Sequence, residues 1–347
     1  LPLTQEPDLQ YLMNVTEQLA QDILDDSLII LRSTVPIGTT RSIVLPILQR
    51  RCADVKIAFC PERTVEGHAL AELTSLPQII GGLEQESIDR AAQIFEKITP
   101  HIVRVSSLET AEMVKLLDNS FRDLNFAYAN QVAEIAPRFG VDAMEAITCA
   151  NQGYTRNRIP VPGFVGGACL EKDPHILTYC TKNRGYDSSL IRIGRAIHER
   201  LPVTVVARVR QLLQDFGKPP QTAKIFLTGL AFKGEPETDD LRGSPSRIIV
   251  KALHEAGFSA VYVHDFVVPY DSLKTWDVIP VTIEEGFKSA DAIIIANNHA
   301  RYKSLPIREL LSTSNLPVIL YDSWRIFSKD DLDVPGIHYE GLGFQKL

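Results

Sequence analysis

Residues 162–173 bring glycines, a thiol, a cation and a carboxylate close together in the chain. Gly166 and the glycine after it can take backbone angles closed to other residues, so we expect Cys169 to lie in an open turn. Lys172 and Asp173 follow within a turn, and a nearby cation favours the reactive thiolate form of a cysteine. These residue types predict a nucleophilic thiol. The alternative is a small buried cysteine in a loop that enters a helix.

Other polar residues follow predicted strands or share a helix face. Thr34 comes after one apolar run and Glu62 after the next, at the strand ends where open α/β sheets bind ligands. Lys115 and Asn119 are four residues apart in a predicted helix and therefore share a face. Thr34 could instead be a cap, Glu62 a solvated carboxylate and Lys115 a surface cation. Asn119 is harder to explain structurally, because Asn is a poor helix former.

The first part of the chain contains short apolar runs, which are typical of buried parallel strands and would position these residues. We expect strands at 27–32, 55–60, 78–81 and 102–105, with helices at 9–26, 39–51 and 87–98. A helical section follows, with a long helix at 111–139, a short one at 142–149, one from 175 onward and one at 188–216. Only Pro137 interrupts the first of them, near its end.

Residues 217–220, Gly-Lys-Pro-Pro, mark the clearest break in composition, and strands and helices alternate again after them. We expect strands at 224–228, 260–264, 292–296 and 318–321, and helices at 246–256, 283–289 and 307–311. Phe232 and Lys233 follow the first of these strands, either as ligand contacts or as packing plus a surface charge. The fold class is therefore predicted to be α/β, with two open parallel units flanking a helical middle section.

The amino-acid composition argues against several classes of protein. With 347 residues and 45% hydrophobic content, the chain is long enough for two or three domains. The net charge of -7 argues against bulk attraction to nucleic acid or to an anionic membrane surface. Five scattered cysteines without a CxxC motif predict neither a disulfide framework nor a metal site, and they favour a reducing compartment. No apolar run approaches the roughly 20 residues of a membrane span, so we expect no membrane association and a cytoplasmic protein.

Six motifs in chain order carry a resemblance to a known family. They are Arg-Ser-Thr-Val-Pro-Ile-Gly-Thr-Thr at 32–40, Pro-Glu-Arg at 61–63 with Glu66 and Gly67, Lys115 with Asn119, residues 163–173, Phe232-Lys233 with 238–242, and residues 322–325. Together they resemble the UDP-glucose/GDP-mannose dehydrogenase family, the nucleotide-sugar 6-dehydrogenases. Arg63, where glucose-specific members usually carry an apolar residue, is similar to the branch that acts on UDP-N-acetylhexosamines such as UDP-N-acetylmannosamine.

This resemblance implies an NAD-dependent, four-electron oxidation of a UDP-hexose or UDP-N-acetylhexosamine C6 alcohol to the uronate, in the service of cell-surface polysaccharide biosynthesis. Cys169 would trap the aldehyde as a thiohemiacetal, which is then oxidised to a thioester and hydrolysed. Lys115 and Asn119 would stabilise the oxyanions. Asp173 and Glu62 would orient water or act as bases, and Thr34 would hold a water.

The resemblance also implies binding residues, partners and domains. The expected nucleotide-sugar contacts are Glu62, Arg63, Lys115, Asn119, Arg158, Phe164, Gly166, Arg195, Phe232 and Lys233, and the expected NAD contacts are Thr34, Glu66, Lys172 and Arg325. Arg195 would reach the site of a partner subunit, in a homodimer formed through the central helix. The expected domains are the carboxyl-terminal part of an NAD-binding Rossmann domain (1–106), a central helical dimerisation and active-site domain (107–217) and a Rossmann-like UDP-sugar domain (218–347).

The chain also departs from the family pattern. No Gly-x-Gly-x-x-Gly fingerprint occurs in it, so we expect the first Rossmann domain to be incomplete, without the βαβ units that cradle the NAD pyrophosphate. Smaller departures include Glu171 where Pro is common and His198 where Asn is common. Two alternative functions follow: a nucleotide-sugar-binding fragment without redox activity, and a two-domain hydroxyacid dehydrogenase with no use for Cys169.

Overall fold

The computed structural model describes residues 7–328 and 332–345. The chain divides into two compact units, one made of the residues up to 122 together with 172–192, the other of residues 123–171 and 193–347. Each unit contains one sheet, and the two are described separately. None of the described helices is both long and apolar enough to cross a membrane.

The first unit contains a four-stranded sheet in the order β1-β2-β3-β4. Its strands are β1 (Leu28–Leu31), β2 (Lys56–Phe59), β3 (Gln78–Gly82) and β4 (Ile102–Arg104). β1 pairs with β2 and β3 with β4 in parallel, whereas β2 and β3 are antiparallel, which differs from the expected arrangement in this one pair. A parallel crossover needs a helix packed on the sheet, and the intervening α3 (Ala69–Ser75) buries no residue.

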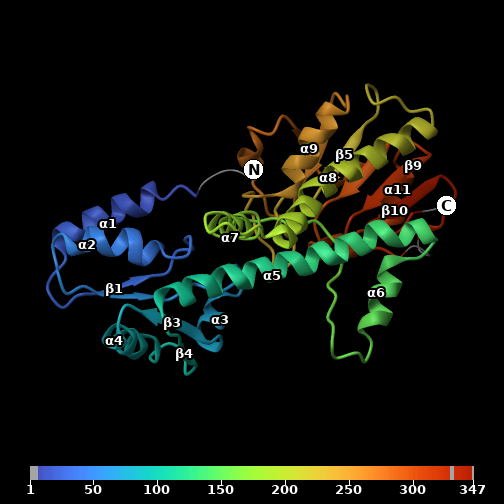
Figure 1. Cartoon of the computed structure of the whole chain (residues 1–347). Coiled ribbons are helices and arrows are strands. Elements are labelled where there is room, and N and C mark those ends of the chain that lie inside the picture. The colour runs from blue at the N-terminus through green and yellow to red at the C-terminus, as the bar shows by residue number, and fades with distance from the viewer. Residues whose placement is uncertain (1–6, 329–331, 346–347) are drawn as a thin grey trace. The chain divides into compact units, whose positions relative to one another are not determined.

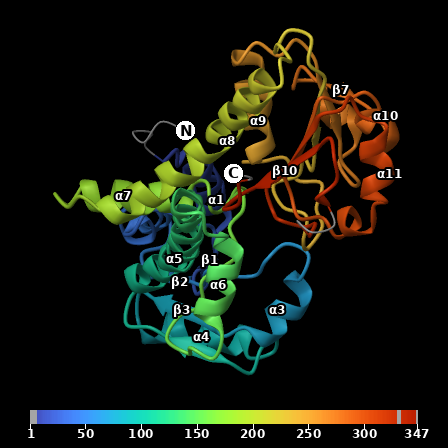
Figure 2. The ribbon, with the colours of Figure 1, turned by 90° about the vertical axis from the view of Figure 1, so that its right-hand side faces the viewer.

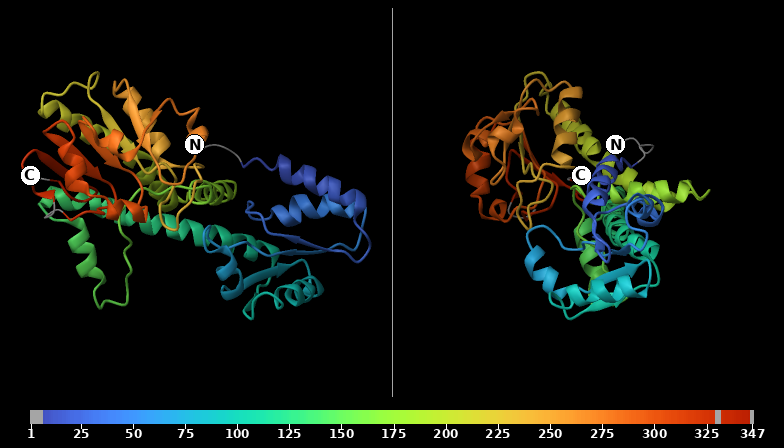
Figure 3. Two further views of the ribbon diagram at one scale, coloured as in Figure 1. Left: turned by 180° about the vertical axis from the view of Figure 1, so that it is seen from behind. Right: turned by 90° about the vertical axis from the view of Figure 1, so that its left-hand side faces the viewer.

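Helices cover both faces of this first sheet (Figure 3). α1 (Gln10–Asp22) and α2 (Leu45–Gln49), which follows a π-helical turn at Thr40–Val44, pack on one face around Leu48 and Phe59. α4 (Gln85–Phe95) packs on the other face through Ile88 and Phe95. The polar loops after β1 and β2 are thereby held at the carboxyl end of a buried sheet.

The long helices expected in the middle of the chain are present (Figure 1). α5 (Leu108–Ile135) runs straight into a 3-10 turn at Ala136–Phe139, where Pro137 cannot continue the α-helix. α6 (Ala143–Asn151), α7 (Asp173–Lys182) and α8 (Ser189–Asp215) follow. In the first unit, α7 packs on α5 through Ile176, Leu177 and Leu116.

The second unit contains a six-stranded parallel sheet in the order β10-β9-β8-β5-β6-β7. Its strands are β5 (Ile225–Thr228), β6 (Val261–His264), β7 (Ile279–Pro280), β8 (Ala292–Ile295), β9 (Val318–Asp322) and β10 (Ile337–Gly341). The strand order reverses between β5 and β8, so the loops that follow these strands flank the point where such sheets bind ligands.

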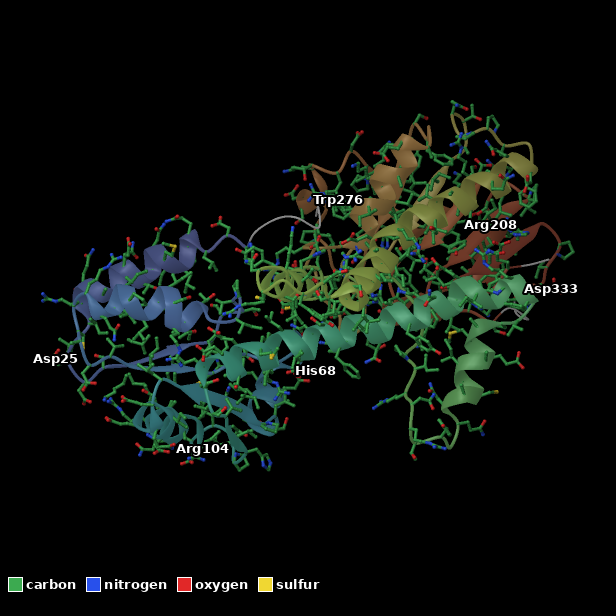
Figure 4. The ribbon with its side chains drawn as sticks, in the orientation of Figure 1. Asp25, His68, Arg104, Arg208, Trp276 and Asp333 are labelled. Atoms are coloured by element: carbon green, nitrogen blue, oxygen red, sulfur yellow. The ribbon has the colours of Figure 1, made fainter. Side chains whose placement is uncertain are left out.

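Helices cover the two faces of the second sheet (Figure 2). α8 and α9 (Pro245–Glu255) pack on one face, and α10 (Ile283–Phe287) and α11 (Ile307–Ser312) on the other. At the sheet edge, Arg208 of α8, which is labelled in Figure 4, donates two hydrogen bonds, of 2.8 and 2.6 Å, to the buried carboxylate of Glu340 on β10. The predicted α/β class, with two Rossmann-like units and a long central helix, is confirmed.

Candidate active site

Helix α5 carries a stripe of buried polar side chains. Glu112, Lys115, Asn119, Asp123 and Asn130 are all at least nine-tenths buried and lie at helical spacing. Burying a polar group is costly unless it has a partner, so each needs a reason to be there. Sequence reasoning found only the second and third of them, although continuing the same spacing along the helix would have pointed to the others.

In the first unit, Asn119 is held by a carboxylate on α7. Its Nδ2 donates a 2.6 Å hydrogen bond to Oδ2 of Asp173, which is fully buried at the start of that helix. The Nζ of Lys172 lies 2.7 Å from the other oxygen of Asp173. The structure thus brings together three residues singled out from the sequence, and Asp173 fixes the direction of the Asn119 amide.

Lys115 lies one turn before Asn119 and is only 9% exposed, so the alternative of a surface cation is wrong. Within the described residues, no carboxylate lies within ion-pair distance of its ammonium group. An ammonium ion that is buried without a counter-charge is unfavourable, and the cost falls when an anionic group binds beside it. Lys115 therefore has the properties of a site for substrate negative charge.

Glu62 follows β2 and forms an ion pair with Arg32, which follows β1. Its Oε1 also accepts a 2.9 Å hydrogen bond from the backbone of Thr64. Burial alone would raise the pKa of Glu62, but the bonds from Thr64 and the charge of Arg32 outweigh it and hold the pKa below its ordinary value. The carboxylate is therefore ionised at neutral pH, as a proton acceptor must be.

The remaining expected residues of the first unit lie in the loops after β1 and β2. Thr34 is half-buried in the loop after β1, and Glu66 is exposed after β2. Arg63 donates a 2.7 Å hydrogen bond to Asp118 of α5.

Glu112 fixes the loop that contains Thr34. Its carboxylate accepts hydrogen bonds from the backbone of Gly38, from the backbone of Thr40 at 2.8 Å and from the Thr40 hydroxyl at 2.6 Å. Burial raises the pKa of Glu112 even though these three hydrogen bonds act against the rise. α5 thus anchors the loop after β1 from one turn before Lys115.

In the second unit, Cys169 lies in a turn and is exposed, so the alternative of a buried cysteine is wrong. The backbone of Glu171 donates a 3.1 Å hydrogen bond to the carbonyl of Gly167 and closes the turn around the thiol. Gly167 has φ +92°, and a Cβ there would come within 2.6 Å of the Phe232 ring. The thiol loop and the Phe232 loop after β5 are therefore in direct contact.

Four other residues expected in the site belong to the second unit. Lys233 lies over the Phe232 ring, 5.4 Å from its centroid. Phe164 is buried in the core of the second unit, and the backbone of Gly166 packs so closely on Gly243 that a Cβ would come within 2.2 Å of its carbonyl oxygen. Arg158 is exposed.

Two expected arginines are engaged within the second unit. Arg195 is buried and forms a 2.6 Å ion pair with Asp123 of α5. Arg325 forms a 2.9 Å ion pair with Asp142, the N-cap residue of α6. The structure does not bring either of them to Cys169. No group of three or more His, Cys, Asp or Glu side chains within residues 7–328 and 332–345 is arranged to hold a metal ion.

Comparison with known proteins places three successive parts of the chain in one family. Models of the UDP-glucose/GDP-mannose dehydrogenase family match in chain order: the NAD binding domain over residues 2–99, the central domain over 109–200 and the UDP binding domain over 226–329.

Similar proteins match along nearly the whole chain. A UDP-N-acetyl-D-mannosamine dehydrogenase from Methanocaldococcus jannaschii is 32% identical over 97% of this chain and 75% of its own length, and one from Pyrococcus horikoshii is 34% identical over 97% and 78%. The solved structure of the P. horikoshii UDP-D-ManNAc dehydrogenase has a TM-score of 0.86 at 32% identity and covers 97% of this chain and 78% of that one. A Methanosarcina mazei NDP-N-acetyl-D-galactosaminuronic acid dehydrogenase gives 0.85 at 25% identity, with 98% and 74% coverage. The chain therefore belongs to the UDP-glucose/GDP-mannose dehydrogenase family of NAD-dependent nucleotide-sugar oxidoreductases.

Proposed function

We propose that this protein is a nucleotide-sugar 6-dehydrogenase that oxidises the C6 alcohol of a UDP-N-acetylhexosamine, with UDP-N-acetylmannosamine as the first candidate, to the uronate. The observation that carries the proposal is the exposed thiol of Cys169 in a turn packed against Phe232. The names of the relatives and Arg63 after Glu62 favour the N-acetylhexosamine. The product would supply cell-surface polysaccharide synthesis. The five unpaired cysteines support a cytoplasmic location.

Three parts of the chain would have separate roles. Residues 1–106 would bind NAD, residues 107–217 would carry the catalytic and dimerisation helices, and residues 218–347 would bind the UDP-sugar.

The residues at hand fit NAD in their chemistry. Thr34 is half-buried after the carboxyl end of β1, and its hydroxyl can bond to a carboxamide or ribose; Lys172 offers a cation for phosphate. Glu66 and Arg325 are the other candidates, and Arg325 is also paired with Asp142. NAD, when bound, accepts a hydride from C6 in each of the two oxidations.

The chain's own groups would carry the remaining steps. A base removes the proton of the C6 hydroxyl during the first oxidation, which leaves an aldehyde. The Cys169 thiolate adds to the aldehyde carbon, and the resulting oxyanion takes a proton to give a thiohemiacetal. Loss of that proton and of a second hydride gives a thioester. Water, activated by the ionised Glu62, adds to the thioester, and the C–S bond breaks to release the carboxylate and the thiol.

The test is a substrate panel with NADH counted per sugar consumed. We expect two NADH per sugar with UDP-N-acetylmannosamine or UDP-N-acetylglucosamine, and a lower kcat/KM with UDP-glucose. Binding of the UDP-sugar without any NADH would indicate a non-redox binding protein. One NADH per turnover with a small hydroxyacid, and none with UDP-sugars, would indicate a hydroxyacid dehydrogenase.

We further propose a homodimer formed through α5. Apolar side chains at Met113, Leu117, Phe121, Tyr128 and Ile135 are 41–67% exposed and recur along the helix at spacings of four and seven. An exposed apolar stripe of this kind is typical of an interface. We expect sedimentation of the native protein at twice the chain mass, and a shift of Phe121→Asp to the monomer mass.

Phe139→Asp is the matched control, because Phe139 is also exposed but lies beyond the end of α5. A monomeric wild type, or equal shifts in both variants, would contradict the α5 interface.

A further inference from the structure

The amide of Asn130 on α5 grips the backbone at the start of the thiol loop. Its Oδ1 accepts a 2.9 Å hydrogen bond from the N–H of Gly163, and its Nδ2 donates a 2.9 Å bond to the Gly163 carbonyl. Asn130 has no exposed surface. One side chain thus satisfies both polar groups of a loop residue, which is the pairing a strand neighbour would provide.

His198 of α8 holds the other side of the same amide. The two bonds to Gly163 fix which end of the Asn130 amide carries hydrogens, so Nδ2 must donate to Nδ1 of His198, 3.3 Å away. Nε2 of His198 then carries the hydrogen and donates to the Asp123 carbonyl at 2.9 Å. Burial lowers the pKa of His198 despite the opposing charge of Asp123, which agrees with a neutral ring. The network has one consistent proton arrangement.

The segment from Gly163 to Cys169 has little room to shift independently. A Cβ on Gly163 would come within 2.6 Å of the Trp324 ring, so the backbone is confined opposite Asn130. Phe164 is buried in the core, and the N–H of Gly167 donates a 3.1 Å bond to the Gly243 carbonyl. The thiol turn therefore takes its position from two anchors, one at Gly163 and one at Gly167.

We propose that Asn130 is a positioning residue for the Cys169 nucleophile, acting through Gly163 and supported by His198. This inference rests on the proposed function, because the loop position matters for the step in which the Cys169 thiolate adds to the aldehyde. Loss of the grip would let the loop drift, and a misplacement of about 1 Å at a reacting group can cost on the order of 100-fold in rate.

The experiment compares wild type, Asn130→Ala and a control in the same unit. Asn151 makes the same two-bond grip on Ile159, at 2.8 and 2.9 Å, in a loop before the thiol segment, so Asn151→Ala removes equivalent bonds elsewhere. We expect kcat of Asn130→Ala to fall on the order of 10- to 100-fold with KM for the UDP-sugar within threefold, and Asn151→Ala to stay within twofold of wild type.

The number of NADH formed per sugar distinguishes a misplaced thiol from a general loss of folded enzyme. With hydroxylamine present to trap free aldehyde, wild type should keep two NADH per sugar. Asn130→Ala should fall towards one, because the first oxidation does not need the thiol. If Asn130→Ala does not fold, Asn130→Asp serves, since it keeps the size and the acceptor for the Gly163 N–H but cannot donate to the Gly163 carbonyl. A folded variant with wild-type kcat and two NADH per sugar would overturn the proposal.

The rate of amide hydrogen exchange in the peptide covering residues 163–169 reports on the Asn130–Gly163 hydrogen bonds and requires no turnover. Faster exchange there in Asn130→Ala, but not in Asn151→Ala, is the expected result, and unchanged exchange would overturn the grip itself. A wild type that makes no NADH, together with faster exchange in Asn130→Ala, would mean that the proposed function has failed while the grip stands.

Discussion

Replacement of Cys169 by Ser should abolish the net four-electron oxidation, with the rate of uronate formation falling at least about 1000-fold. A hydroxyl is a far weaker nucleophile towards the aldehyde than a thiolate, and the variant has no other thiol in the turn to form the thioester. The first oxidation needs no covalent bond to the enzyme, so slow formation of one NADH and an aldehyde should remain. Counting NADH per sugar and trapping the aldehyde with hydroxylamine measures both outcomes.

The fold should tolerate this change, because Cys169 is exposed and its sulfur fills no core space. We expect the free energy of unfolding to change by less than about 0.5 kcal/mol. Cys149→Ser is the matched control, since Cys149 is also exposed but lies on α6. Two NADH per sugar from Cys169→Ser at the wild-type rate would refute the covalent mechanism.

Much of the architecture could be predicted from local pattern. Apolar runs such as Leu28–Leu31 and Ile225–Thr228 became strands because they are long enough to cross a sheet and too apolar to face water. The four-residue spacing of Lys115 and Asn119 also predicted a shared face, because the positions of two residues around a helix depend only on their separation in sequence.

Long-range partners could not be predicted in the same way. The direction of β3 depends on whether α3 packs on the sheet. β10 contains Glu340, a charge that becomes acceptable in a buried strand because His338 and Arg208 bond to it, the latter from 132 positions earlier in the chain. Asn130 continues the helical spacing of Lys115 and Asn119, so local pattern could have marked it as buried, but not named its partner. Its importance lies in Gly163, 33 residues later, which only the folded chain brings within hydrogen-bonding distance.

Lys115→Met should separate activity from stability. Methionine keeps the length of the side chain and removes the charge, so the developing oxyanion loses a preorganised donor, and we expect kcat to fall on the order of 100- to 1000-fold. The folded state should hold or gain stability, because the change removes a buried ammonium with no carboxylate partner in the described structure. Steady-state kinetics and urea unfolding at the same pH measure the two effects.

A fall in kcat without a loss of stability is the decisive feature of the Lys115 result, because a residue that only supports the fold would lose activity and stability together. Lys182→Met provides the control: Lys182 is exposed at the end of α7, and both its kcat and its unfolding free energy should stay near wild type. If Lys115→Met kept kcat within threefold, or lost more than about 2 kcal/mol of stability, the ammonium would be structural. If kcat fell while stability held, the unpaired charge would be explained as one kept for the substrate.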